Sequence, residues 1–103
     1  MAKLSEYLLE ATMVRDAVAI KKVLKQKLGI DFEEPVAAKL SNVKYSLMFA
    51  RLPADAVAID HEQMTIVVSG NHCYVIDGDD NMKGPFAVDD YEKIINAFRI
   101  LNR

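Results

Sequence analysis

The chain has 103 residues, of which 51% are apolar and 27% charged, with four glycines, three prolines and one cysteine. This length suits one ordinary domain, and the apolar fraction is too high for a disordered segment. A single cysteine excludes an internal disulfide and a cysteine-based zinc cluster. No apolar run approaches the roughly 20 residues that a bilayer span needs, and charged residues interrupt the first part of the chain. We therefore expect a single domain over residues 1–103, cytoplasmic, without a cofactor or membrane contact.

The charge is small in sum but unevenly distributed. Thirteen basic and fifteen acidic residues give a net charge of −2, which argues against a general nucleic-acid binder. Residues 1–52 carry a net +3 and residues 53–103 a net −5. Such asymmetry can steer a charged partner, although lysines at a helix end and aspartates in turns are also what local physics favours. Both interpretations stay open.

Residues 5–28 show the pattern of one long amphipathic helix. Apolar side chains recur at spacings of three and four, which is the helical period. They are Leu9, Met13, Ala17, Ile20, Leu24 and Leu28. Glutamates lie near the start and lysines near the end, the order that the helix dipole favours. Gly29 can adopt the left-handed conformation that ends a helix, so we predict a helix over Ser5–Leu28.

The stretch that follows contains a helix entry signal and an ambiguous segment. Acidic residues precede Pro35, which suits the first helical position because it has no amide hydrogen, and this predicts a short helix over Pro35–Ser41. In Val43–Leu52, apolar and polar residues alternate as in a strand, but a helical stripe also fits. The aromatic and β-branched residues favour the strand, which we predict.

Three apolar runs predict a meander of antiparallel strands. Ala56–Ile59 and Met64–Ser69 are separated by an Asp-His-Glu-Gln turn at residues 60–63. Met64–Ser69 and His72–Asp77 are separated only by Gly70-Asn71, a two-residue hairpin loop whose residues tolerate positive φ. That loop sets the register, with Ser69 opposite His72, Val68 opposite Cys73, Val67 opposite Tyr74 and Ile66 opposite Val75.

The register divides the hairpin into two faces. One face is entirely apolar and should pack on the helices. It consists of Met64, Ile66, Val68, Cys73 and Val75. The other face is mixed and should be partly wet or meet another element. It consists of Thr65, Val67, Ser69, His72, Tyr74 and Ile76.

The last quarter of the chain predicts turns, a short edge strand and a final helix. Residues 77–81 and Gly84-Pro85 are turn signals, and Phe86–Val88 suits a short strand. Asp89, three residues before Glu92, is typical of a capping box that begins a helix. The predicted fold class is therefore α+β, with a long N-terminal helix, a short second helix, an antiparallel three- to four-stranded meander and a C-terminal helix.

Cys73 and the two histidines have the side chains most suited to catalysis or metal binding. His72 adjoins Cys73, but adjacent strand residues point to opposite faces, so we interpret Cys73 as a core residue. His61, His72 and Asp77 are the basis of an alternative hypothesis, a small metal- or metabolite-dependent enzyme. Zinc sites use convergent ligands with paired short spacings, a pattern that these three residues lack. Glycine-rich phosphate loops and nucleophile elbows are also missing from the sequence, so we do not expect an enzyme.

Two further charged groups were considered as binding sites. Asp77, Asp79 and Asn81 have the spacing of the first three ligands in a calcium loop, but Met82 stands where glycine is required. A turn is the better interpretation. Lys21, Lys22 and Lys25 could contact phosphates, which gives a second alternative, a weak nucleic-acid binder.

The main functional hypothesis is a non-catalytic intracellular protein–protein interaction module. A 103-residue chain cannot bury all of this apolar surface, so we expect a protein partner or a homodimer. An adaptor or inhibitor, such as a mobile genetic element can encode, fits this profile. The candidate contact regions are the mixed sheet face, the outer flank of the first helix and the acidic turns. The candidate contact residues are Thr65, Val67, Tyr74, Ile76, Asp77, Asp79 and Asp80.

Overall fold

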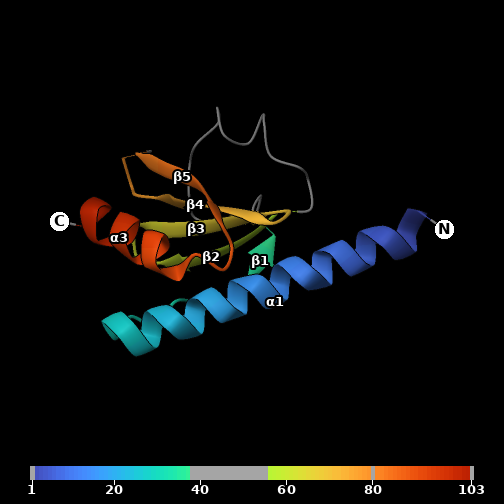
Figure 1. Ribbon diagram of the computed structural model, residues 1–103, viewed down its shortest axis with the longest axis horizontal. Helices are drawn as coiled ribbons and strands as arrows, with labels where there is room; N and C mark the ends of the chain where they lie inside the picture. Colours follow the sequence, from blue (N-terminus) through green and yellow to red (C-terminus); the bar gives the residue numbers. More distant parts are fainter. Residues whose placement is uncertain (1, 38–55, 80, 103) are drawn as a thin grey trace.

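A computed structural model describes residues 2–37, 56–79 and 81–102, with side chains described from Thr12 onward (Figure 1). Within these ranges one helix precedes and another follows a run of five antiparallel strands, which confirms the α+β class. The elements are α1 (Ala2–Leu28), β1 (Val36–Ala37), β2 (Val57–His61), β3 (Met64–Ser69), β4 (His72–Ile76), β5 (Met82–Ala87) and α3 (Tyr91–Leu101). In the described part of the chain, no helix is long and apolar enough to span a membrane.

The sheet is an antiparallel meander in which each strand pairs with the next, in the order β1-β2-β3-β4-β5. All four register pairs predicted for β3 and β4 are confirmed. Gly70 has a φ of +63°, the left-handed conformation that the two-residue loop requires. The meander was predicted to have three to four strands, whereas the described residues form five.

The turn between β2 and β3 is tighter than predicted. Asp60 and His61 belong to β2, where they pair with Thr65 and Met64, so only Glu62 and Gln63 remain in the turn. Glu62 has a φ of +54°. The polar residues that signalled a four-residue turn therefore lie largely within the strand.

Both described helices pack on one face of the sheet (Figure 1). The α1 helix contacts β2 and β3, while α3 contacts β4 and β5. The core between these layers contains the predicted apolar sheet face and the central part of the α1 stripe. Its members include Met13, Ala17, Ile20, Leu24, Phe32, Ile59, Met64, Ile66, Val68, Cys73, Val75, Ile94 and Phe98. Each large apolar side chain buried there contributes about 1.5–3 kcal/mol of stabilisation.

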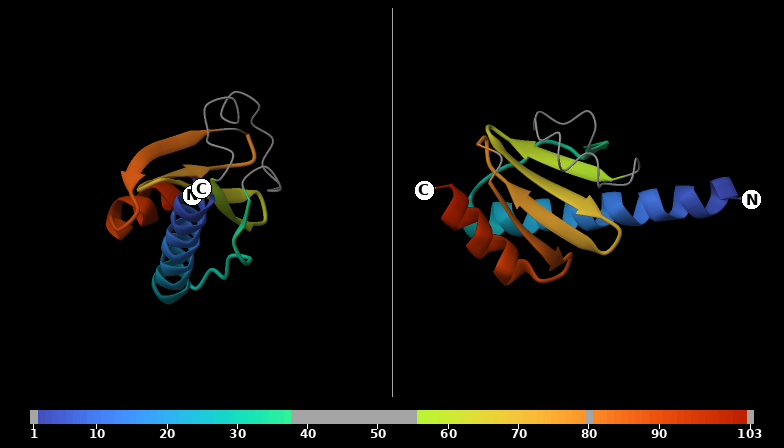
Figure 2. Two further views of the ribbon diagram at one scale, coloured as in Figure 1. Left: turned by 90° about the vertical axis from the view of Figure 1, so that its right-hand side faces the viewer. Right: turned by 90° about the horizontal axis from the view of Figure 1, so that it is seen from above.

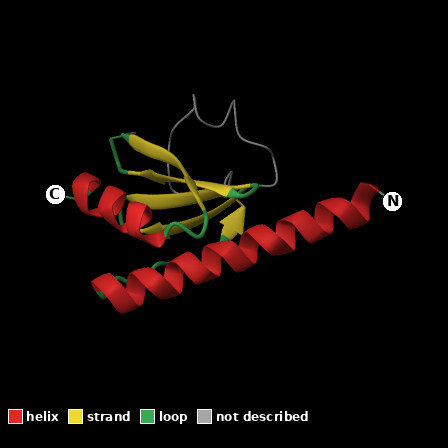
Figure 3. Cartoon of the chain, in the orientation of Figure 1, coloured by secondary structure: helices red, strands yellow, loops and turns green. Residues whose placement is uncertain are grey.

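The α1 helix begins three residues earlier than predicted and ends where predicted. Gly29 has a φ of +70°, and its amide donates to the Lys25 carbonyl at 3.0 Å, which confirms its role at the C-terminus. The N-terminal turns of α1 project past the edge of the sheet (Figure 2). The backbone then returns to the sheet through the loop at residues 29–35 (Figure 3).

Two predicted segments need correction. The helix predicted over Pro35–Ser41 is wrong at its start, because Val36 and Ala37 form β1 and pair with Ala58 and Val57. Strand pairing at the sheet edge outweighs the helix entry signal of Pro35. The β-branched residue Val36 also favours a strand over a helix. The rest of that helix and the strand predicted over Val43–Leu52 lie outside the described residues.

The second correction concerns the edge strand and the start of the final helix. Gly84 and Pro85 were predicted to form a turn, but they lie within β5, joined by a cis peptide bond. Proline is tolerated there because β5 is an edge strand with a register shift opposite Cys73 and Val75. The N-cap of α3 is Asp90 rather than Asp89, and its carboxylate accepts from the Lys93 amide at 3.5 Å.

Candidate binding surface

The mixed sheet face is largely buried. Thr65, Val67 and Ile76 are each at most 1% exposed, and Tyr74 is half-buried. Asp60 is buried on the same face, opposite Thr65, whose hydroxyl donates to its carboxylate at 2.5 Å. A partner cannot reach side chains that are buried within the chain, so their burial argues against this face as a contact surface.

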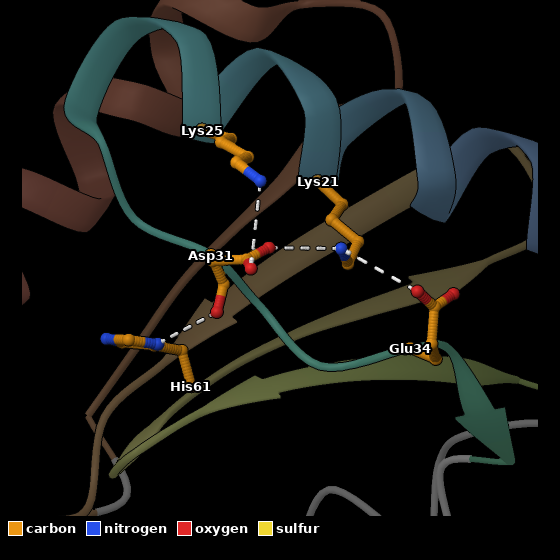
Figure 4. Close-up of polar contacts among 5 residues, drawn as sticks. All are labelled: Lys21, Lys25, Asp31, Glu34 and His61. Carbon is orange, nitrogen blue, oxygen red and sulfur yellow. Dashed lines mark hydrogen bonds and ion pairs between the residues drawn. The ribbon is translucent and has the colours of Figure 1, made fainter.

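A polar cluster lies where α1 meets the following loop (Figure 4). The Lys21 ammonium lies 3.2 Å from an oxygen of Asp31 and 3.8 Å from the Glu34 carboxylate. Lys25 lies 3.8 Å from the second oxygen of Asp31. The hydrogen bond from Lys21, with its charge and that of Lys25, holds the pKa of Asp31 below its ordinary value.

This polar cluster attaches the loop to the helix and to β2. The Asp31 carbonyl lies 3.2 Å from His61 Nδ1, and the Glu33 amide donates to the Asp60 carbonyl at 2.8 Å. Between these anchors Phe32 enters the core, with its ring centroid 5.5 Å from that of His61. A phosphate would therefore have to compete with Asp31 for Lys21, whereas the exposed pair of Lys25 and Asp31 contributes little.

The register separates the two histidines. His61 pairs with Met64 at one end of β3, whereas His72 pairs with Ser69 at the other end. Five residues of strand separate these ends by about 17 Å. Asp77 follows β4 at the end where His61 lies, so the three residues of the enzyme hypothesis do not converge. Among the described residues, no group of three His, Cys, Asp or Glu side chains is arranged to hold a metal ion.

The first aspartate of the acidic turn, Asp77, accepts hydrogen bonds from within the same turn. The Asp77 carboxylate accepts backbone hydrogen bonds from Asp79 and Asn81, both at 2.9 Å, and one from the Asn81 side chain at 3.0 Å. Partial burial raises the pKa of Asp77, but the hydrogen bonds from Asn81 and Asp79 outweigh this effect and the pKa is lowered. These contacts support the turn interpretation, and Asp80 lies outside the described residues.

Cys73 lies in the core, where the apolar face of the sheet meets the helices. Burial, together with the charges of Asp16 and Asp90, raises the pKa of its thiol to about 12. A thiol with this pKa is a poor nucleophile at neutral pH, which supports its interpretation as a core residue.

A groove lies between β5 and α3, on the helix-facing side of the sheet edge. It has a volume of about 490 Å³. Its walls are Met82, Lys83, Gly84 and Phe86 from β5, and Lys93, Asn96, Ala97 and Ile100 from α3. Met82 is 48% exposed and Ile100 is 47% exposed, the two highest values among the large apolar residues that the structure describes.

The geometry of both walls follows from the sequence. On α3, Lys93, Asn96 and Ile100 recur at spacings of three and four, which places them on one side of the helix. On β5, Lys83 pairs with Val75 and Phe86 pairs with Cys73, so both share the helix-facing side of the sheet. Gly84 allows β5 to approach β4, because a Cβ there would lie 2.8 Å from the Cys73 carbonyl oxygen.

The charged residues that line the groove are both lysines, one on each wall. Lys93 lies 3.5 Å from the Asp90 carboxylate, and because the Lys93 side chain is exposed and Asp90 is partly exposed, this pair contributes little. Lys83 takes part in no ion pair among the described residues. The two lysines are also two of the four basic residues in the otherwise acidic second half of the chain.

This groove was not predicted from the sequence, because Gly84-Pro85, in its β5 wall, was predicted to be a turn. The signal that was present is the spacing of Lys93, Asn96 and Ile100, which places them on one side of the final helix. Comparison of the chain with protein-family models, with curated proteins and with solved structures found no match.

Proposed function

We propose that this chain is a non-catalytic protein-binding module, of the adaptor or inhibitor kind, that contacts its partner through the β5–α3 groove. One observation carries the proposal. Among the described residues, four large apolar side chains are exposed, and the two with the largest exposures, Met82 and Ile100, both belong to the lining of this groove. Apolar side chains that gather in a surface groove are typical of interaction sites.

The other two exposed apolar residues provide a matched control. Val14 on α1 is 38% exposed and Val36 on β1 is 39% exposed, and neither lines the groove. A double variant, M82S/I100S, removes the two exposed apolar side chains of the groove lining. A second double variant, V14S/V36S, makes the same kind of change elsewhere on the surface.

The experiment compares affinity capture by three immobilised proteins from cells that naturally express the chain. We expect the wild type and V14S/V36S to retain the same partner, and M82S/I100S to lose it while keeping its circular dichroism spectrum. Retention of the same proteins by M82S/I100S would contradict the proposal. Loss of the partner by V14S/V36S alone would place the contact on another surface and would also contradict it.

A further inference from the structure

We infer that the β5–α3 groove recognises a short segment of its partner in which an apolar side chain lies close to a carboxylate. This inference rests on the proposed function and adds the chemistry of the partner to it. The lining contains two exposed apolar residues, Met82 at the edge strand and Ile100 on α3, and two lysines, Lys83 and Lys93, one on each wall.

The positive charge of the groove favours a partner segment with negative charge. Carboxylates are missing from the described groove lining, whereas each wall contributes a lysine. Asp90 is the acidic residue paired with Lys93, and because the lysine side chain is exposed, this contact at 3.5 Å can be exchanged for a partner carboxylate at little cost. Lys83 has no such competitor among the described residues. A carboxylate bound between the walls therefore gains two favourable interactions.

The apolar side chains select a peptide over a simple anion. Met82 and Ile100 gain stability only when an apolar group covers them, and inorganic phosphate or a nucleic-acid backbone supplies none. Phe86 and Ala97 extend the apolar lining between the walls. A groove of about 490 Å³ accommodates a few side chains rather than a folded domain.

The edge of β5 favours recognition through side chains. Strand addition to a sheet edge depends on a regular row of backbone donors and acceptors. Pro85 lacks an amide hydrogen, and the pairing of β5 with β4 shifts register near Gly84 and Pro85, so β5 offers an interrupted row. The partner segment therefore gains its specificity from its apolar and carboxylate groups.

The test measures binding of fluorescein-labelled decapeptides to the full chain by fluorescence anisotropy. Each peptide of the first panel holds one leucine, with an aspartate one to three residues away. A second panel replaces aspartate by asparagine, and a third replaces leucine by serine. We expect at least one first-panel peptide to bind, and both replacements to weaken its binding about tenfold, with the aspartate effect shrinking at high salt.

Lysine variants test whether the groove lysines cause the preference for aspartate peptides. K83Q and K93Q should each reduce the preference for aspartate over asparagine, whereas K27Q, which removes an exposed lysine outside the groove, should leave it unchanged. Equal binding of the aspartate and asparagine peptides would overturn the inference, as would equal effects of K27Q and K83Q. A single-stranded oligonucleotide of equal charge that binds as tightly as the best peptide would also overturn it.

The peptide-binding test and the affinity-capture experiment can fail independently of each other. If M82S/I100S loses the natural partner but no peptide of any panel binds the wild type, the groove binds a folded surface and this inference fails alone. If M82S/I100S retains the natural partner, the proposed function itself fails.

Discussion

Phe32 and Phe98 lie edge to face, with their ring centroids 5.8 Å apart, and this contact joins the loop after α1 to α3. Both rings are buried, and the polar cluster of Lys21, Asp31 and Glu34 holds the loop in place on the helix side. Because α3 forms one wall of the groove, this aromatic pair links the position of that wall to the rest of the core.

Removal of the Phe32 ring should be among the most destabilising single changes in the described chain. F32A leaves a cavity against Phe98 and His61, and should lower the free energy of unfolding by about 3–5 kcal/mol. F32L should lower it by about 1.5 kcal/mol or less. Urea unfolding followed by circular dichroism measures both values. If F32A lowered the free energy of unfolding by less than F32L does, the Phe32 ring would not fill the core.

Gly84 and Gly70 both have positive φ, but their surroundings differ. At Gly84 a Cβ would meet the Cys73 carbonyl oxygen at 2.8 Å, whereas at Gly70 nothing lies within 4 Å. G84A should therefore cost about 2–4 kcal/mol, since both backbone strain and steric contact oppose it. G70A should cost about 1 kcal/mol, from backbone strain alone. Equal losses in urea unfolding would contradict the close approach of β5 to β4.

The Cys73 thiol should be protected in the folded protein. Its pKa is raised to about 12 by burial, so the thiolate is scarce at neutral pH and out of reach of solvent. We expect 5,5′-dithiobis(2-nitrobenzoate) at about pH 8 to react slowly with the native chain and fully with the chain unfolded in guanidinium chloride. Rapid reaction of the native chain would contradict the burial. Cys73 is the single cysteine, so the signal belongs to it alone.

Because Asp31 forms an ion pair with Lys21, we expect the stability of the fold to depend on pH in the acidic range. Lys21 holds the pKa of Asp31 below 3.8 in the folded state, so the folded chain binds a proton there less readily than the unfolded chain. The pair therefore stabilises the fold above the unfolded pKa of about 4, and this contribution is lost as the pH falls through the lower folded value. Carboxyl NMR titration should show the low pKa in the wild type and a higher one in K21Q. The same Asp31 pKa in both proteins would contradict the role of Lys21.

The parts of the fold predicted correctly are those set by short-range chemistry. Gly29 ends α1, and the Gly70-Asn71 loop determines the register of β3 and β4 over its full length. The apolar face that follows from this register lies in the core. In these places a local backbone requirement and the hydrophobic pattern indicate the same structure.

The parts predicted wrongly are those in which tertiary context outweighs local signals. Val36 pairs with Ala58, which is 22 residues away in the chain, and no local pattern shows such a partner. The Gly84-Pro85 pair is a strong turn signal, yet an edge strand with a register shift accepts both residues. The groove was missed for the same reason, because Gly84-Pro85 in one of its walls was predicted to be a turn. For the second sheet face both outcomes were left open, and Thr65 is buried there because its hydroxyl bonds Asp60.

Site-specific photo-crosslinking can show whether the partner lies against the β5–α3 groove. The photoreactive residue p-benzoylphenylalanine is placed at the position of Ile100 in one protein and at that of Val14 in another, and both are expressed in the natural host. Irradiation should give a discrete crosslinked product from the Ile100 position and none from the Val14 position. A product from the Val14 position alone, or from neither position, would contradict the account.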